Sequence, residues 1–170
     1  MIILGIDPST VATGYSVMEI EDPGDHFSPL VFSPTVIEYG AIKTKRSNRM
    51  SDRITKIYDN LEDLIEKYEP DIVVSEDQYG GRVNAVKALS HVRGAIMVLC
   101  SKRELPLYLL APSRVKKTMT GKGNCNKQKV IEHVSSKFGI DEDDLTSDMA
   151  DAIAIAYTYL FFEDDKLRTA

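Results

Sequence analysis

The order of hydrophobic patterns along the chain limits the fold more than any other feature of the sequence. Apolar segments with strand character come first, at residues 2–6, 15–20 and 36–42. Helical spacing then alternates with short strands: helices are predicted at 50–68, 83–102, 112–119, 127–138 and 148–162, and strands at 71–75 and 107–110. Because parallel neighbours need a helix to cross over the sheet, this order predicts an α/β fold. We expect a mixed five-stranded sheet with an antiparallel edge and flanking helices.

Individual residues predict where several elements begin and end. Ser47 or Ser51 is expected to cap the first helix, and Pro70 to stop it. Gly139 should end the helix that begins at 127, and proline-rich residues 21–35 should form a loop. The apolar side of the 83–102 helix should hold Val83, Val86, Leu89, Ala95, Ile96 and Leu99.

The length of 170 residues suits a single domain over 1–170. Hydrophobic residues make up 43% and charged residues 28%, as in globular proteins. No apolar run approaches the roughly 18 residues of a membrane span, and no basic region precedes residues 2–6, so we expect neither a membrane partner nor a targeting peptide. Cys100 and Cys125 fit no metal-ligand spacing and are expected to be free thiols in a reducing cytoplasm.

Charge is distributed very unevenly along the chain. Residues 79–137 contain twelve basic and two acidic residues, a balance of +10 within a chain whose net charge is −5. A second basic cluster holds Lys43, Lys45, Arg46 and Arg49. A single cluster of this kind is compatible with a solvated face. The 79–137 segment, however, predicts a polyanionic partner, because Lys and Arg neutralise phosphates.

Four carboxylates fall where a sheet and a helix would bring them together. Asp7 closes the first strand and Glu76 the fourth, and active sites in open sheets lie beyond the carboxyl ends of strands. Asp148 and Asp151 lie three residues apart, on one face at the start of the last helix. Taken singly, each also suits a turn, a strand end or a helix dipole. Together they predict an acidic pocket for Mg²⁺-like cations, a pair of which can hydrolyse a phosphodiester.

A set of short motifs runs in a fixed order from residue 2 to about 158. The motifs are Gly5-Ile6-Asp7-Pro8-Ser9, Thr13-Gly14-Tyr15, Ser75-Glu76, Arg93-Gly94, Ser113-Arg114-Val115-Lys116-Lys117-Thr118 with Gly121, Gly123 and Lys127, and the run from Ser147 to Ala156. This set resembles RuvC-type Holliday junction resolvases. The resemblance implies an RNase H-like fold, a homodimer and an endonuclease that nicks two strands of a four-way DNA junction symmetrically. It also implies Mg²⁺ or Mn²⁺ as cofactor, with two ions per active site.

The resemblance further implies roles for individual residues. The family's metal-binding carboxylates match Asp7, Glu76, Asp148 and Asp151. Its functional lysines match Lys116 and Lys127, which would offset charge on the scissile phosphate. Tyr79 is the expected aromatic residue that stacks on an unpaired base. Further DNA contacts are expected from Arg82, Lys87, Arg93, Arg114, Lys117, Lys122 and Lys129.

The sequence departs from this family at two places. The segment from Asp22 to Thr35 is longer than expected, and Asp77 stands before Tyr79 as an apparent insertion. Whether Asp77 is an alternative ligand, and whether Tyr79 stacks on a base, therefore stays open. The chain is similar to phage- or plasmid-type relatives, which implies a bacterial or phage-infected cytoplasm. Other branched DNAs, and recombination or branch-migration proteins, are then possible partners.

Three other classes of protein are also compatible with parts of the sequence. The hairpin of Asp7-Pro8-Ser9-Thr10 and Gly14 resembles the phosphate-binding hairpin of sugar kinases and actin-like ATPases, but those enzymes close two domains around ATP. A non-catalytic junction-binding protein would need only the basic surface. A ribosomal-RNA-processing nuclease shares the fold, yet Lys116, Lys127 and the Asp148/Asp151 pair weigh against it.

Overall fold

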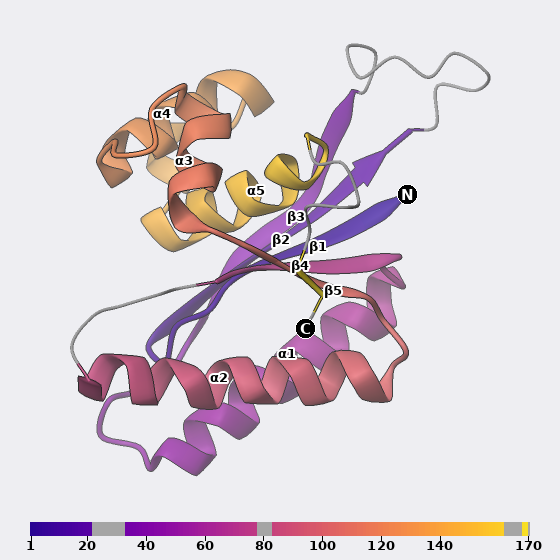
Figure 1. Ribbon diagram of the computed structural model, residues 1–170, viewed down its shortest axis with the longest axis vertical. Helices are drawn as coiled ribbons and strands as arrows, with labels where there is room; N and C mark the ends of the chain where they lie inside the picture. The colour runs from indigo at the N-terminus through magenta and orange to yellow at the C-terminus, as the bar shows by residue number, and fades with distance from the viewer. Residues whose placement is uncertain (22–32, 78–82, 162–167, 170) are drawn as a thin grey trace.

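A computed structural model shows one mixed sheet with helices on both faces (Figure 1). It describes residues 1–21, 33–77, 83–161 and 168–169. The strands are β1 (Ile2–Asp7), β2 (Ala12–Ile20), β3 (Pro34–Lys43), β4 (Ile72–Glu76), β5 (Leu107–Leu110) and β6 (Arg168–Thr169). The helices are α1 (Met50–Tyr68), α2 (Val83–Lys102), α3 (Pro112–Thr120), α4 (Lys127–Phe138) and α5 (Ser147–Tyr159), with a short 3-10 helix η1 (Glu142–Asp144).

The strands lie in the order β3-β2-β1-β4-β5-β6. β1, β2 and β3 pair antiparallel, whereas β4 lies parallel to both β1 and β5. The expected mixed sheet of five strands is therefore confirmed. The two-residue β6 adds a further antiparallel edge that was not expected, because so short a segment carries no periodic signal.

The two faces of the sheet are covered by different helices. Figure 1 shows α1 and α2 on one face and α3, α4 and α5 on the other. Strand residues alternate between these layers: Leu4 and Val73 pack with α1 and α2, whereas Ile3 and Val74 pack in the core that contains α5. By the same alternation, Asp7 and Glu76 lie on the α5 face. Their strands are neighbours in register, with Ile6 opposite Ser75.

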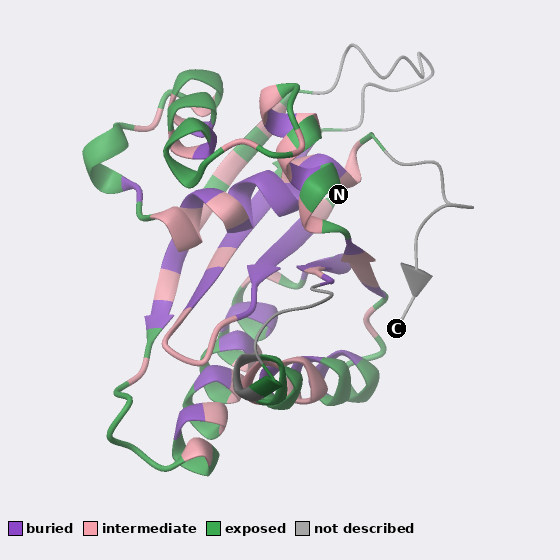
Figure 2. Ribbon diagram, turned by 60° about the vertical axis from the view of Figure 1, so that its left-hand side comes forward, coloured by how far each residue is buried: buried purple, intermediate pink, exposed green. Residues whose placement is uncertain are grey.

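Small residues let α5 approach the sheet very closely. A Cβ added to Gly14 would lie 1.9 Å from the carbonyl oxygen of Asp148, and one added to Gly5 would lie 2.5 Å from that of Ala152. The buried Ser16 hydroxyl donates a hydrogen bond of 2.9 Å to the Ala152 carbonyl. Ala152 and Ala156 of α5 lie against Gly5, and Ala150, Ala152, Ala154 and Ala156 are all fully buried. Figure 2 shows α5 built of buried and half-buried residues, with the buried ones concentrated in its middle.

Helix α1 begins differently from the expectation. Its N-cap position is Arg49, and no side chain caps the first turn, so the prediction of Ser47 or Ser51 was wrong. The Arg49 guanidinium instead pairs with Asp52 at 3.1 Å. The N-cap position is thus held by an arginine in an exposed ion pair, and not by a serine whose hydroxyl would cap the helix. At the other end, Glu69 adopts a left-handed conformation just before Pro70.

Helix α2 is apolar on more than one side, which misled the prediction of its buried face. Val83 and Val86, which were expected on the apolar side of the helix, with that side open to an interface or a core, are 69% and 41% exposed. Val92 is fully buried instead, together with Ile96 and Leu99. A helix with apolar residues on two sides gives no single stripe from which to choose the buried face.

Other expectations concern the ends of elements and the cysteines. Helix α5 ends at Tyr159, before the predicted end at 162. Residues 22–32 of the expected loop lie outside the described residues. Cys100 and Cys125 are both unpaired, as expected. Within the described part of the chain, no helix has both the length and the apolar character that crossing a bilayer requires.

We expect Gly14→Ala to lower the free energy of unfolding by about 3 kcal/mol, because the added methyl group would overlap backbone atoms of α5. Gly94→Ala is the matched control, since a Cβ at Gly94 in α2 meets no atom within 4 Å. The control should be neutral or gain up to about 1 kcal/mol from helix propensity. Urea unfolding followed by circular dichroism measures both. Equal free energies of unfolding for the two variants would show that the contact between α5 and β2 tolerates a larger residue at position 14.

Candidate active site

A pocket of about 450 Å³ opens beyond the carboxyl ends of β1 and β4. Two of its carboxylates come from these strand ends and two from the first turns of α5, while α3 and α4 each contribute a lysine. Residues far apart in sequence are thus brought together by the parallel pairing of β1 with β4 and by the close packing of α5 on the sheet. The members predicted from the sequence are Asp7, Glu76, Asp148, Asp151, Lys116 and Lys127.

Asp7 is the most buried of the four carboxylates and is only 7% exposed. Burial, together with the negative charges of Asp151 and Glu76, raises the pKa of Asp7 to about 8. Burial likewise raises the pKa of Asp151, against the opposing effect of Lys127. In the absence of a counter-ion, the pocket therefore favours a proton on Asp7 at neutral pH.

Lys127 points into this acidic pocket from the first residue of α4. Its Nζ lies 3.2 Å from Oδ2 of Asp151 and 4.0 Å from Oδ1 of Asp148. Burial works against the ammonium, but the charge and hydrogen bond of Asp151, together with the charges of Asp7 and Asp148, outweigh it and raise the pKa of Lys127. The helix start is fixed by Asn126, whose side chain accepts a hydrogen bond of 3.0 Å from the backbone of Lys129. The cap thus holds Lys127 at the rim of the pocket.

The turn between β1 and β2 forms another wall, with Ser9 and Thr10 among its lining residues. The Thr13 hydroxyl donates to the Ser9 carbonyl at 2.5 Å, and the Thr44 hydroxyl donates to the Thr10 carbonyl at 2.5 Å. The buried Arg53 of α1 also donates to the Thr10 carbonyl, through Nε at 3.0 Å and through Nη2. These bonds fix the backbone that follows Asp7.

Arg53 was missed in the sequence, although a signal for it was present. It lies four residues before Ile57 and eight before Leu61, on the stripe of α1 that is buried. A charged residue on such a stripe is rarely buried without polar partners. Its position therefore indicates a residue that binds backbone carbonyls below the surface.

Asp77 and Arg93 form an ion pair of 2.6 Å next to the pocket. Arg93 lines the pocket, whereas the Asp77 side chain is 6% exposed and is not part of the lining. Asp77 was considered as an alternative metal ligand, but its carboxylate is held by Arg93. Arg93 was expected to contact DNA, yet it reaches the pocket already paired.

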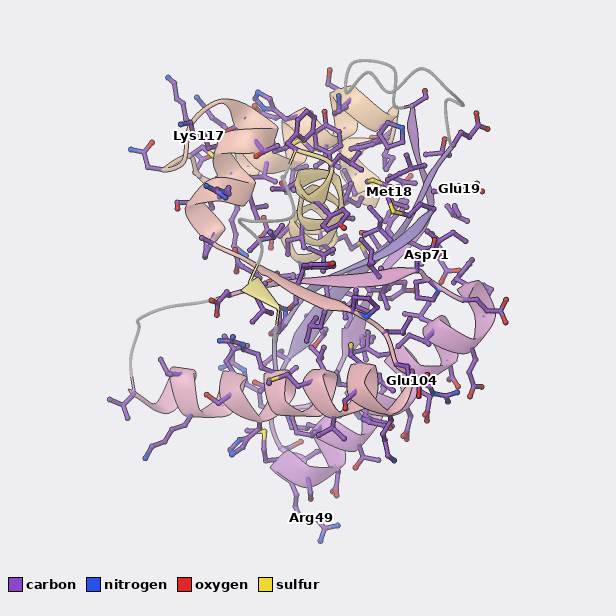
Figure 3. The ribbon with its side chains drawn as sticks, turned by 45° about the vertical axis from the view of Figure 1, so that its right-hand side comes forward. Met18, Glu19, Arg49, Asp71, Glu104 and Lys117 are labelled. Atoms are coloured by element: carbon purple, nitrogen blue, oxygen red, sulfur yellow. The ribbon has the colours of Figure 1, made fainter. Side chains whose placement is uncertain are left out.

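The other expected DNA contacts lie on several surface elements. Lys87 is exposed on α2, and Lys117 is exposed on α3. Figure 3 shows Lys117 directed away from the sheet, at the opposite end of the molecule from Arg49 of the second basic cluster. Tyr79 and Arg82 lie outside the described residues. Further exposed basic residues are Arg114 on α3, Lys122 in the turn after it and Lys129 on α4.

The pocket fits a hard divalent cation by the chemistry of its donors. All four acidic residues offer carboxylate oxygens, the ligand type that Mg²⁺ and Mn²⁺ take. The raised pKa of Asp7 also indicates negative charge that a cation would offset. As the side chains stand, no group of three acidic, His or Cys residues in the described part of the chain could hold a metal ion. The ammonium of Lys127 lies close to two of the carboxylates instead, so a cation would require side-chain movement.

Comparison with protein families and curated proteins identifies close sequence relatives. The family model described as crossover junction endodeoxyribonuclease RuvC matches residues 3–159. The crossover junction endodeoxyribonuclease RuvC of Caldicellulosiruptor saccharolyticus is 33% identical over 162 residues, which cover 94% of this chain and 92% of that protein. The corresponding protein of Protochlamydia amoebophila is 34% identical over 157 residues, covering 92% of this chain and 88% of the relative.

Solved structures share the fold over the whole chain. The Thermus thermophilus RuvC structure has a TM-score of 0.82 at 24% sequence identity, with both chains covered completely. Thermus thermophilus RuvC in complex with a Holliday junction substrate has a TM-score of 0.84 at 23% identity, covering 100% of this chain and 99% of that one. The described sheet and its helical layers are therefore those of the RuvC structures.

The raised pKa of Asp7 predicts an unusual dependence of stability on pH. Between about pH 4 and about pH 8 the folded protein keeps a proton that the unfolded chain has released, so stability should fall as pH rises. Asp7→Asn should reduce this fall and be more stable than wild type at about pH 8.5 in EDTA. Urea unfolding at about pH 5.5 and about pH 8.5 tests both statements. If the free energy of unfolding depends on pH in the same way in wild type and Asp7→Asn, the raised pKa of Asp7 is contradicted.

Proposed function

The chain belongs to the family of crossover junction endodeoxyribonucleases RuvC, and from this premise we propose that it resolves four-way DNA junctions by paired symmetric nicks. The observation that carries the proposal is the convergence of four carboxylates and two lysines on one pocket. Family membership also favours an endodeoxyribonuclease over the kinase-like and RNA-processing alternatives. The intact acidic set argues against a protein that only binds junctions.

In this proposal Asp7, Glu76, Asp148 and Asp151 hold two Mg²⁺ or Mn²⁺ ions. Such ions activate water and stabilise the leaving oxygen of a phosphodiester. Lys116 and Lys127 contribute positive charge to the pocket, where negative charge grows on the phosphate in the transition state. The turn that Arg53 holds keeps the backbone after Asp7 in place, so this wall of the pocket needs little reorganisation.

Binding of the junction is proposed to rest on basic residues outside the acidic pocket. The exposed lysines of α2, α3 and α4 would neutralise backbone phosphates near the pocket. Because these contacts are separate from the carboxylates, binding and cleavage should be separable by substitution. Stacking of Tyr79 on an unpaired base belongs to the same proposal and rests on the family resemblance alone.

We also propose a homodimer, because paired nicks in one junction need two pockets. The exposed apolar side chains of α2 supply a surface for it, and they are Val83, Val86, Met97 and Val98. Apolar residues that gather on one exposed helix face are typical of protein interfaces. Sedimentation velocity measures the oligomeric state, and a monomer at about 10 μM would contradict this arrangement.

The wild-type protein should nick a synthetic four-way junction in the presence of Mg²⁺ and leave linear duplex largely uncut. Asp7→Asn and Asp151→Asn should abolish cleavage while keeping junction affinity, because the lost carboxylates serve the metal and the basic surface stays intact. Denaturing gels measure nicking, with a replication fork as a third substrate for breadth. Gel-shift titration measures binding. Equal cutting of junction and duplex would remove the resolvase function, and activity in both variants would show that the site is elsewhere.

Lys127→Ala should reduce cleavage of bound junction by about a hundredfold. Lys127 Nζ faces the carboxylates of the pocket, and in the proposal the phosphate that gains negative charge in the transition state lies there. Lys117→Ala is the matched control: Lys117 is exposed on α3 and should act only on binding. The control should lower the salt dependence of binding by about one unit. Single-turnover cleavage at saturating enzyme, beside binding at several salt concentrations, separates the two. Wild-type cleavage by Lys127→Ala would make Lys127 a backbone contact.

A further inference from the structure

The ion pair between Asp77 and Arg93 lies behind the strand end that presents Glu76 to the pocket. Side chains of β4 alternate between the two faces of the sheet, and Val73 packs with α1 and α2 while Val74 packs on the α5 side. Glu76 therefore faces α5 and the other carboxylates. Asp77, the next residue, meets Arg93 of α2, with Nη2 2.6 Å from Oδ1.

Arg93 is associated with both sequence neighbours of Glu76. Besides its bond to Asp77, it lines a small cavity of about 10 Å³ together with Ser75. The Ser75 hydroxyl is buried and has no hydrogen-bond partner among the described residues. The backbone of Asp77 is also fixed, because its N–H donates to the Leu110 carbonyl at 2.7 Å. The backbone that carries Glu76 is therefore held by β5 from one side and by α2 from behind.

The burial of Asp77 makes its partner difficult to replace. The Asp77 side chain is 6% exposed, and that of Arg93 is 26% exposed. If Arg93 left to bind a DNA phosphate, the Asp77 carboxylate would remain buried without its partner, which is strongly unfavourable. Arg93 thus differs from Lys87 on the same helix, whose exposed side chain has no such constraint.

We propose that Arg93 is a positioning residue, which fixes the end of β4 through Asp77 and thereby sets where Glu76 stands in the pocket. This assignment replaces the sequence-based expectation that Arg93 contacts DNA. It rests on the proposed function, because it treats Glu76 as a metal ligand. Residues that orient metal ligands from behind commonly change metal affinity or activity by about 10- to 100-fold when they are replaced.

The test compares Arg93→Gln, Asp77→Asn and the double variant with wild type. Each single variant should lower single-turnover cleavage at saturating enzyme by about tenfold or more and raise the Mg²⁺ concentration needed for half-maximal rate. Binding of Mg²⁺ itself, read from the rise in melting temperature on adding the ion, should weaken in parallel. The salt dependence of junction binding should stay as in wild type, because no phosphate contact is lost.

The double variant distinguishes a shared role from two separate ones. It replaces both charges by neutral amides and leaves no unpaired buried charge, so it should fold even if Arg93→Gln alone does not. Its cleavage should be no worse than that of either single variant, because the two side chains act as one unit. Arg93→Lys keeps the charge and should recover part of the activity.

Arg103→Gln is the matched control, since it also breaks ion pairs of an arginine: Arg103, just after the end of α2, pairs with Glu62 at 2.7 Å and with Glu66, and none of the three lines the pocket. It should leave cleavage and the Mg²⁺ response unchanged. The proposal is overturned if Arg93→Gln lowers the salt dependence by about one unit while bound junction is cut normally, or if Asp77→Asn is silent. A wild-type protein that binds Mg²⁺ but cuts no junction would instead contradict the proposed function, and the Mg²⁺-induced melting shift would still test Arg93.

Discussion

The close contact between α5 and the β1–β2 hairpin is the constraint on which the pocket depends. Gly14 and Gly5 leave no room for a side chain beneath the helix, and the Ser16 hydroxyl binds a helix carbonyl directly. The helix that carries Asp148 and Asp151 therefore lies against the strand that carries Asp7. A larger spacing between helix and sheet, of the kind that Leu or Ile would impose, would separate the carboxylates. Small residues in the core thus determine the geometry of a polar site.

The same proximity creates electrostatic strain. Four carboxylates share one pocket, and burial raises the pKa of Asp7 to about 8. Lys127 relieves part of this strain through its contacts with Asp151 and Asp148, but the ammonium groups of Lys116 and Lys127 do not balance four acids. The pocket is thus costly in stability when it holds no cation, which is typical of sites built to bind charge. Binding of divalent ions and stability of the fold should therefore be coupled.

The sequence predicted what is local or periodic and missed what depends on distant partners. The strand ends at Asp7 and Glu76, and the helical pair Asp148 and Asp151, could be located because strand patterns and helix periods mark them. The buried face of α2 could not, because Val83 and Val86 are apolar yet exposed. The roles of Arg53 and Arg93 depend on contacts with Thr10 and Asp77. These partners lie far away in the sequence and become neighbours only in the folded chain, so no local pattern marks them. In the sequence, an arginine that binds a phosphate looks the same as one that binds a backbone carbonyl or a buried carboxylate.

Because side chains alternate across the sheet, one face presents the carboxylates of the pocket and the other face holds the strand ends that carry them. On the α5 face, Asp7 and Glu76 present their charges to the pocket. On the opposite face, α1 and α2 each supply one arginine: Arg53 binds the backbone just after β1, and Arg93 binds the residue just after β4. Each of the two strand ends that carry a carboxylate is therefore tied from behind by a guanidinium. Because a strand turns successive residues to opposite faces, a residue that follows the carboxylate can be held by a helix of the other layer. Arg53 does this without lining the pocket, whereas Arg93 binds Asp77 and also lines the pocket. Negative charge is then concentrated on the α5 face, while the guanidinium groups that hold the strand ends come from α1 and α2.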